Sequence, residues 1–257
     1  MPGSLTVVGT GIRFGVQLTP EARAALLRAD RVLHLVSEPV ARQWLEALRP
    51  DAQSLHTFYA PGKDRAETYG EMVEAILDPL REGYQVCAAF YGHAGVFVSP
   101  SHEAIRQARA AGYQATMLPG ISAEDCLFAD LGLDPGTTGC QSYEATAFLI
   151  TRRPVDAAAL LILWQVGVVG EWSQVLETDL RRLAVLIERL LELYPEDHEA
   201  ILYEASPYPV GEPIVVRTPL GRLGEAGVTA ASTLVVPPRE RPLPDPTVCD
   251  RLRSLPP

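Results

Sequence analysis

Two glycine-containing turns follow directly after apolar, strand-like segments, and this arrangement constrains the fold more than any other feature. Residues 86–90 lead into Tyr91-Gly-His-Ala-Gly95, and residues 115–118 lead into Pro119-Gly120. Short apolar runs bounded by glycine are typical of buried parallel strands. In open α/β sheets, ligands bind at the carboxyl ends of such strands. The sequence therefore predicts an α/β fold with a ligand site at these turns.

Strand-like and helical patterns alternate along most of the chain, as in α/β proteins. Thr19 and Pro20 form an N-cap and first-turn pair, and Gly83 is placed to stop a long helix. The expected helices are 20–28, 39–48, 65–81, 101–111, 123–131 and 179–194. The expected strands begin at Val7 and continue with 31–36, 86–90, 115–118, a strand near Tyr143, 148–150, 160–165, 200–203, 214–217 and 233–236.

Two α/β domains joined near Pro119 are the simplest division of this pattern. Residues 1–118 are expected to form the N-terminal domain, and residues 119–237 the C-terminal domain. Residues 238–257 are rich in Pro and Arg. Such a composition predicts a tail or a strap across another surface.

Composition excludes several functional classes. The net charge of −10 over 257 residues argues against nucleic acid as a partner, because phosphate binding needs a clustered basic face. No apolar run approaches the roughly 20 residues needed to span a bilayer. The four cysteines form no CxxC pair. They are expected to be reduced thiols of a cytoplasmic protein, with no zinc site. Small molecules or peptides are the more natural substrates.

The first strand is followed by Gly9-Thr-Gly11, which invites comparison with dinucleotide-binding turns. The next glycine is Gly15, so the G-x-G-x-x-G pattern is absent, and the helix begins only near Pro20. A nicotinamide cofactor is disfavoured, because its pyrophosphate needs a helix N-terminus immediately after the glycines. By itself the turn reads equally well as an ordinary tight turn.

Two further positions carry polar groups at these turns. His93 lies between glycines, which allow the backbone to approach a ligand closely. Without that context it is a loop histidine with no role. Ser122 is an N-cap with Glu124 and Asp125 in the first turn. Taken alone, this pattern is an ordinary helix start.

The segment before the long helix contains Tyr59, and the helix itself begins with Arg65 and carries Tyr69 one turn later. Arg65 and Tyr69 are four residues apart, so they share one helix face, and Tyr59 lies beyond a Pro-Gly turn. Spacing alone favours packing, in which Tyr69 begins the apolar stripe and Arg65 extends along it.

These motifs resemble those of the tetrapyrrole methylase superfamily, which uses S-adenosylmethionine, and within it the borosin α-N-methyltransferases, which methylate backbone amides of a ribosomally made peptide. The resemblance is close from Tyr91 to Glu144 and extends from Val7 to Pro237. It implies two α/β domains with the methyl donor, and its product S-adenosylhomocysteine, in the cleft between them. Ala94 departs from the family, which usually has proline there. The donor-binding residues implied by the resemblance are Tyr91, His93, Val96, Phe97, Ser122, Ala123, Gln165, Tyr203, Ala205, Ser232 and Thr233.

The resemblance also implies that Arg65, Tyr69 and Tyr59 are catalytic. An amide nitrogen is a poor nucleophile because its lone pair is delocalised, so methylation requires removal of the amide proton and stabilisation of the imidate oxygen. Tyr69 held by Arg65 is expected to be the base, and Tyr59 or Arg65 the donor to that oxygen.

Fungal members carry their substrate as a C-terminal extension, whereas this sequence ends at Pro257 without an apolar core peptide. The expected partner is therefore a separate precursor peptide, methylated several times, and a homodimer is expected to enclose it. Two alternatives stay open: a methylase acting on a corrinoid or another small molecule, and a non-catalytic module that binds the methyl donor or a partner.

Overall fold

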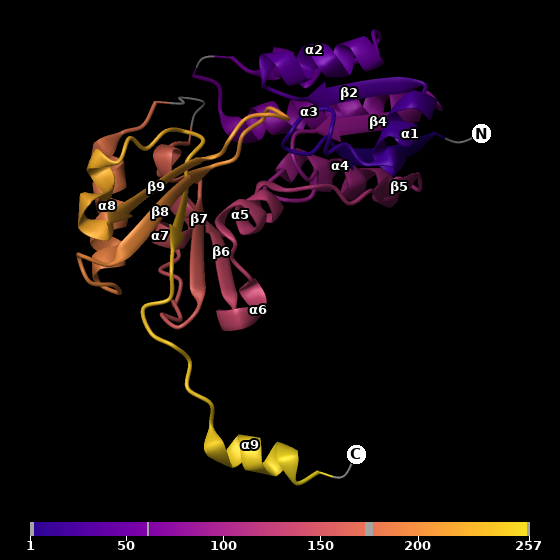
Figure 1. Ribbon diagram of the computed structural model, residues 1–257. Coiled ribbons are helices and arrows are strands. Elements are labelled where there is room, and N and C mark those ends of the chain that lie inside the picture. The colour runs from indigo at the N-terminus through magenta and orange to yellow at the C-terminus, as the bar shows by residue number, and fades with distance from the viewer. Residues whose placement is uncertain (1–2, 61, 173–176, 256–257) are drawn as a thin grey trace. The chain divides into compact units, whose positions relative to one another are not determined.

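The computed structural model describes residues 3–60, 62–172 and 177–255, arranged in two compact units (Figure 1). The first unit comprises 3–133, 171–172 and 205–214, and the second comprises 134–170, 177–204 and 215–255. Contacts thus divide the chain after Leu133, whereas the sequence pattern suggests a junction near Pro119. Helix α5 (Ala123–Leu131) belongs to the first unit, where Asp130 forms an ion pair with Arg13.

A five-stranded sheet forms the centre of the first unit. Its strands are, in spatial order, β3 (Gln53–Ser54), β2 (Arg31–Leu35), β4 (Gln85–Phe90), β1 (Ser4–Gly9) and β5 (Gln114–Met117). All neighbouring pairs are parallel. The carboxyl ends of β1, β4 and β5 therefore lie at the same edge of the sheet, and each of the three strands continues into a glycine-containing turn.

Helices cover both faces of this sheet, which explains its continuous apolar strands. The helices are α1 (Pro20–Arg28), α2 (Pro39–Leu48), the 3-10 turn η1 (Leu55–Phe58), α3 (Arg65–Arg81) and α4 (Ser99–Ala110). Helices α3 and α4 pack on Val86, Ala88 and Phe90. Helices α1 and α2 pack on the alternate residues Cys87 and Ala89.

Local signals fix where these helices begin. Thr19 caps α1, as predicted, by accepting a hydrogen bond from the Ala22 amide at 3.1 Å. Asp64 caps α3 through the amides of Ala66 and Glu67. The predicted bounds of the helices 20–28, 39–48, 65–81 and 123–131 are confirmed. The predicted stripe of α3 is also found: Tyr69 is partly buried, and the buried members are Met72, Val73, Ile76, Leu77 and Leu80.

A second, mixed sheet forms the centre of the other unit. Its strands are, in order, β6 (Cys140–Glu144), β7 (Leu160–Trp164), β10 (Thr233–Val236), β8 (Glu199–Glu204) and β9 (Ile214–Pro219). Strand β6 is parallel to β7, and β10 is antiparallel to both β7 and β8. The prediction of an α/β fold is confirmed by these two sheets and their helices.

Helices of the second unit are α6 (Pro135–Thr138), α7 (Ala145–Ile150) and α8 (Leu180–Leu191), with 3-10 turns η2 (Val166–Val168) and η3 (Leu220–Glu225). The prediction of a strand over 148–150 is wrong, because this segment lies in α7. Both Glu144 oxygens accept hydrogen bonds from the amides of Thr146 and Ala147, which starts a helix. Phe148 is buried on its inner face.

The predicted C-terminal tail contains a helix, α9 (Pro246–Arg253), none of whose residues is buried. Asp245 caps it through the Thr247 and Val248 amides. The last two prolines of the predicted tail, like Pro61 of the predicted Pro-Gly turn, lie outside the described residues. Within the described ranges, no helix has both the length and the apolar character needed to cross a membrane.

Candidate functional site

The glycine turns after β1 and β4 are joined directly. The Gly11 amide donates to the Gly92 carbonyl at 3.1 Å, and the Gly92 amide donates to the Gly11 carbonyl at 3.0 Å. A Cβ atom at Gly9 would lie 2.2 Å from the Gly92 oxygen, so no side chain fits there. A Cβ at Gly120 would lie 3.4 Å from the Gly9 Cα. We call Gly9, Gly11, Gly92 and Gly120 the glycine cradle, formed where three strands end.

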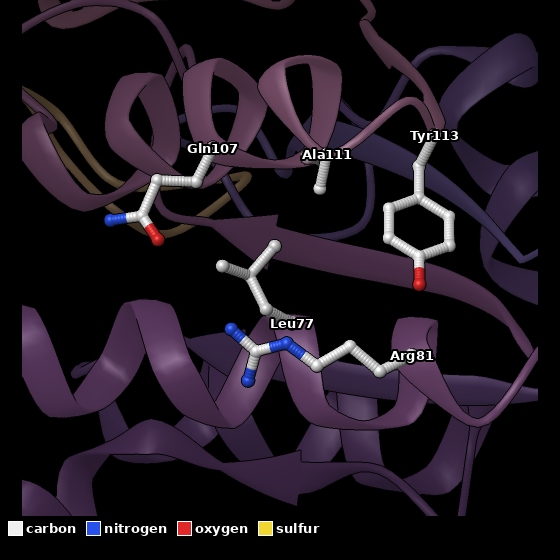
Figure 2. A pocket seen from close by; sticks show the side chains of 6 residues that line it. Leu77, Arg81, Gln107, Ala111 and Tyr113 are labelled. Atoms are coloured by element: carbon white, nitrogen blue, oxygen red, sulfur yellow. The ribbon is translucent and has the colours of Figure 1, made fainter.

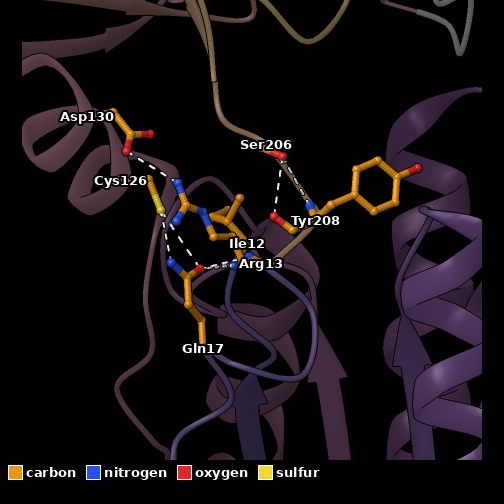
Figure 3. Close-up of polar contacts among 7 residues, drawn as sticks. All are labelled: Ile12, Arg13, Gln17, Cys126, Asp130, Ser206 and Tyr208. Carbon is orange, nitrogen blue, oxygen red and sulfur yellow. Dashed lines mark hydrogen bonds and ion pairs between the residues drawn. The ribbon is translucent and has the colours of Figure 1, made fainter. Parts of the chain in front are cut away.

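Gln17, which the sequence analysis did not single out, holds the loop that follows Gly11. Its Oε1 accepts hydrogen bonds from the Ile12 and Arg13 amides at 2.9 and 2.8 Å, and its Nε2 donates to the Cys126 sulfur at 3.4 Å (Figure 3). The side chain of Arg13 reaches Asp130 in the same view. Gln17 therefore links the glycine cradle to α5, the helix capped by Ser122. The only sign of this role in the sequence is that Gln17 is a polar residue in a glycine-rich loop.

The loop from His93 to Phe97 is ordered by its own main chain. The Gly95 amide donates to His93 Nδ1 at 2.8 Å, and the Val96 amide donates to the His93 carbonyl at 3.1 Å. Phe97 has φ 55° and a residue exposure of 51%. A left-handed conformation is unfavourable for a bulky residue and is found most often at functional sites. These contacts fix the predicted donor loop in one conformation.

Tyr91 lies at the start of the same loop, immediately after β4. Its amide donates to the Leu35 carbonyl at 3.3 Å, which ties it to β2. Burial, together with the nearby Cys126 and Glu38, raises the pKa of the Tyr91 hydroxyl to about 12. At neutral pH this hydroxyl is therefore protonated and available as a hydrogen-bond donor.

Ser122 forms a complete capping box at the start of α5. Its hydroxyl donates to Asp125 Oδ2 at 2.6 Å, and the Asp125 amide donates back to the hydroxyl at 3.2 Å. The Ser122 amide also donates to Asp125, at 2.6 Å. Ser122 is 6% exposed, and Ala123 is the first residue of the helix. The contacts within the chain are those of an ordinary helix start, so a role for this pair in donor binding stays a prediction.

The remaining predicted donor-site residues lie at strand ends around the second sheet. Gln165 follows β7 in a left-handed conformation, with φ 60°. The next turn is tightly packed, because a Cβ at Gly167 would lie 1.9 Å from the Thr229 oxygen. Thr233 pairs with Tyr203 across β10 and β8, and both are buried. Ala205 follows the end of β8.

Glu204, which the sequence analysis did not assign, organises this edge. Its Oε1 accepts hydrogen bonds from the hydroxyls of Thr229 and Ser232, both at 2.6 Å. The Ser232 hydroxyl in turn accepts from the Thr229 amide at 2.9 Å. The predicted donor-binding residues thus form two groups. Those of the first unit lie around the glycine cradle, and Gln165, Tyr203, Ser232 and Thr233 lie together in the second unit.

The three predicted catalytic residues are brought together in the first unit. Arg65 is the first residue of α3, and Tyr69 lies one turn further along. Burial raises the pKa of Tyr59 to about 12, and the neighbouring Tyr69 raises it as well. The positive charge of Arg65 opposes this rise. Both tyrosine rings pack against the core beneath α3, and Lys63 holds the preceding segment by donating to the Phe58 carbonyl at 3.3 Å.

A shallow pocket of about 110 Å³ lies between α3 and α4 (Figure 2). Its lining includes Leu77, Arg81, Gln107 and Tyr113. These residues are near the C-terminal ends of α3 and α4, which lead into the amino ends of β4 and β5. The pocket therefore lies at the end of the sheet opposite to the glycine cradle.

Over residues 3–60, 62–172 and 177–255, no group of three or more His, Cys, Asp or Glu side chains is placed to hold a metal ion. Cys87 and Cys126 are buried, and Cys140 and Cys249 are partly buried; all four are free thiols.

Relatives with known names match nearly the whole chain. A methyltransferase/ribosomally synthesized cyclic peptide gymnopeptides precursor from Gymnopus fusipes is 40% identical over 98% of this chain and 61% of that relative. The corresponding omphalotin A precursor from Omphalotus olearius is 39% identical over 99% of this chain and 62% of its own length. A type III borosin cyclic peptide precursor from Anomoporia bombycina is 40% identical over 93% of this chain but 28% of its own length. The chain thus spans about three fifths of the first two relatives.

Solved structures share the fold. Uroporphyrin-III-C-methyltransferase from Thermus thermophilus superposes with a TM-score of 0.65 and 22% identity, covering 93% of each chain. A cobalt precorrin-4 methyltransferase gives the same TM-score with 19% identity, covering 91% of this chain and 94% of that one. The family model of the tetrapyrrole (corrin/porphyrin) methylases matches residues 4–224, which include the whole first sheet, the glycine cradle and every strand of the second sheet except β10. The chain therefore belongs to the tetrapyrrole (corrin/porphyrin) methylase family.

Proposed function

We propose that the protein is an S-adenosylmethionine-dependent methyltransferase that methylates successive backbone amides of a ribosomally made precursor peptide. The observation that carries this proposal is the grouping of Tyr59, Tyr69 and Arg65, in which Tyr69 and Arg65 lie close enough to Tyr59 to change its pKa. Relatives about 40% identical are named as methyltransferases joined to peptide precursors. A peptide substrate accounts for a group of phenols and a guanidinium that binding of the methyl donor alone does not require.

The residues around the glycine cradle fit a nucleoside methyl donor. Three glycine turns approach one another closely at the ends of β1, β4 and β5, where ligands of α/β sheets bind. Protonated Tyr91 and the strained Phe97 border it. When bound, the donor supplies an electrophilic methyl group on a cationic sulfur. His93, Val96, Ser122 and Ala123 are the residues of this unit that would hold it.

Amide methylation requires stabilisation of the amide oxygen and removal of the amide proton, and we assign the first role to Tyr59 and the second to Tyr69. Tyr59 keeps its proton, because its pKa is raised to about 12, so it can donate to the amide oxygen as that oxygen gains charge. Tyr69, which lies one helical turn from Arg65, is assigned as the proton acceptor, and Arg65 as the charge that holds it.

The substrate peptide is proposed to be a separate chain, and the enzyme a homodimer. A backbone methylase must admit an extended strand whose successive amides face opposite sides, which requires an enclosing site. Residues from a second copy would help to enclose it. The apolar face of α3 is used within its own unit, whereas the C-terminal segment exposes Leu243, Val248 and Leu252. That segment is the better candidate for the enclosing element.

Mass spectrometry tests the proposal directly. The purified protein is incubated with S-adenosylmethionine and each peptide encoded beside its gene, and the intact masses of peptide and protein are followed over time. Serial gains of one methyl group on a peptide are expected. Gains on the protein itself would place the substrate in the same chain. Methylation of a corrinoid or porphyrin precursor, with none on any peptide, would overturn the peptide substrate and favour the small-molecule alternative.

Binding separates an enzyme from a non-catalytic module. Calorimetry with S-adenosylmethionine and S-adenosylhomocysteine should give one site per chain. Binding without methylation of any substrate would favour a non-catalytic module, and failure of the folded protein to bind either nucleoside would contradict the assigned donor site.

A further inference from the structure

Resting on the proposed function, one structural demand falls on Tyr59 and Tyr69, which must reach the oxygen and the nitrogen of the same amide. Tyr69 lies in α3, whereas Tyr59 lies before that helix and directly after η1. Reacting groups have to be held in one geometry, and a misplacement of about 1 Å can lower a rate by about 10²-fold. A group that fixes the segment of Tyr59 against α3 therefore determines how well the two phenols act together.

The main chain between the two tyrosines allows movement. Gly62 has φ 73°, and no atom lies within 4 Å of its Cβ position. Glycine adopts such conformations readily and restricts the backbone less than any other residue. The Lys63 amide donates to the Ala60 carbonyl at 3.2 Å, but this bond involves no residue of α3. The angle between this segment and the helix thus needs another contact to hold it.

The side chain of Lys63 supplies a contact from this segment to the helix. Its Nζ donates to the carbonyl of Phe58, the residue before Tyr59, at 3.3 Å. The same Nζ donates to Glu71 Oε2, with which it forms an ion pair. Glu71 lies in α3, two residues after Tyr69. A single ammonium group therefore joins the segment that carries one tyrosine to the helix that carries the other.

Burial and connectivity distinguish this ion pair from those on the surface of α3. The Lys63 side chain is 17% exposed. At the other end of the helix, Arg81 is 49% exposed and pairs with Glu74 at 2.8 Å and Asp78 at 2.7 Å, both of its own helix. Exposed pairs of that kind contribute little, because water screens them. A largely covered ammonium group instead requires its partners, so the contacts of Lys63 hold two chain segments together.

We propose that Lys63 and Glu71 form a clamp that positions Tyr59 against Tyr69 and Arg65 for amide methylation. The clamp acts on the main chain beside Tyr59 and on α3, and it touches neither substrate nor methyl donor. The ammonium group keeps its three protons throughout turnover. Lys63 is therefore a positioning residue, and the transferred proton passes only through the tyrosines.

Lys63→Met tests the clamp, because it keeps the length of the side chain and removes both bonds of Nζ. The methylation rate at saturating peptide and S-adenosylmethionine should fall by about 10- to 100-fold. Donor affinity should stay within a few-fold, because the glycine cradle does not depend on this contact. Lys63→Arg keeps charged donors for the carbonyl and the carboxylate and should retain most of the rate. Equal losses in both variants would assign chemistry to the ammonium group itself and overturn positioning.

Glu71 provides the second half of the test. Glu71→Ala should slow turnover less than Lys63→Met does, because the bond from Nζ to the Phe58 carbonyl remains. The double variant should be no slower than Lys63→Met alone, since two partners of one interaction do not contribute independently. Losses that multiply in the double variant would show that the two residues act separately, which contradicts a clamp.

Arg81 provides the matched control on the same helix. Arg81→Met removes the ion pairs to Glu74 and Asp78, but it joins no second segment to α3. Its rate should equal that of the wild type. Urea unfolding of every variant checks that the rates are compared between folded proteins. A loss of rate in Arg81→Met as large as that in Lys63→Met would mean that any lost charge pair on α3 slows turnover, and would overturn the specific role of Lys63.

A readout without turnover uses carbon-13 NMR of the tyrosine Cζ atoms in the unliganded protein. Tyr69→Phe should shift the Tyr59 resonance, because Tyr69 lies close enough to Tyr59 to change its pKa. In the Lys63→Met background the same substitution should cause a smaller shift. Equal shifts in the two backgrounds would overturn the clamp.

The outcomes for the clamp and for the proposed function can be told apart. Where Lys63→Met does not fold, Glu71→Ala and the NMR comparison in that background decide. Wild-type turnover by folded Lys63→Met removes only the clamp. Absence of peptide methylation by the wild-type protein removes the proposed function, whereas the NMR comparison still shows whether Lys63 holds Tyr59 beside Tyr69.

Discussion

Gly11 and Gly92 exchange two main-chain hydrogen bonds, of 3.1 and 3.0 Å, and so fasten the turn after β1 to the turn after β4. The two turns are about 80 residues apart in the chain, yet they form one surface. This close approach explains why the positions around it are glycines. It also places a closely packed, hydrogen-bonded main chain beside the proposed donor site.

Gly9→Ala should be costly, because the new Cβ would lie 2.2 Å from the Gly92 oxygen. We expect a loss of about 1–3 kcal/mol in the free energy of unfolding, the usual cost of overpacking, together with weaker binding of S-adenosylmethionine. Gly70→Ala is the matched control. Gly70 lies within α3 with no atom near its Cβ position, so alanine should stabilise by about 0.5–1 kcal/mol. Urea unfolding measures both, and equal effects would contradict the packing described.

Gln17→Leu should destabilise the loop before α1. The substitution leaves the Ile12 and Arg13 amides without their acceptor, at a cost of about 1–3 kcal/mol for a buried unpaired donor. Donor affinity should fall as the glycine cradle loosens from α5. Gln107→Leu serves as the control, because the side-chain amide of Gln107 donates to Glu103 on the surface of α4. Unchanged calorimetric affinity in Gln17→Leu would show that this side chain does not hold the site.

Stability should fall at mildly acid pH. Burial lowers the pKa of both His34 and His56, so below about pH 6.5 the unfolded chain binds protons that the folded protein does not. Their contribution is complete above pH 6.5 and is lost as the pH falls towards the folded pKa. The slope is at most about 1.4 kcal/mol per pH unit for each histidine. His34→Gln should flatten the dependence of unfolding free energy on pH between 5 and 6.5; an unaltered slope would mean that His34 is not the buried base.

Much of the fold could be predicted because the residues that start a helix are close together in the sequence. Thr19 with Pro20, and Ser122 with Asp125, are cap pairs that specify a helix start within four residues. The prediction of a strand over 148–150 was wrong because of another local signal. Two backbone amides donate hydrogen bonds to the Glu144 carboxylate, and this cap starts a helix despite the β-forming character of Phe148 and Ile150.

The site was less predictable, because its geometry depends on residues that are distant in the chain. The left-handed conformations of Phe97 and Gln165 have no signature in side-chain type. Glu204 meets Thr229 and Ser232 only when β8 and β10 are paired. The pairing of Arg65 with Tyr69 could be suggested from helix spacing, but the position of Tyr59 beside them required the fold.

The measurement that bears most directly on the central claim is tandem mass spectrometry of a precursor peptide after reaction with the wild-type protein and with Tyr69→Phe, at saturating S-adenosylmethionine. Calorimetry on the same samples checks that the donor affinity of the variant is within a few-fold of wild type. The account predicts methyl groups on successive backbone nitrogens for the wild type and a rate lower by about 10²–10³ for the variant. Arg65→Ala should behave in the same way. Methyl groups on side chains rather than backbone nitrogens, or near-normal turnover by Tyr69→Phe, would contradict it.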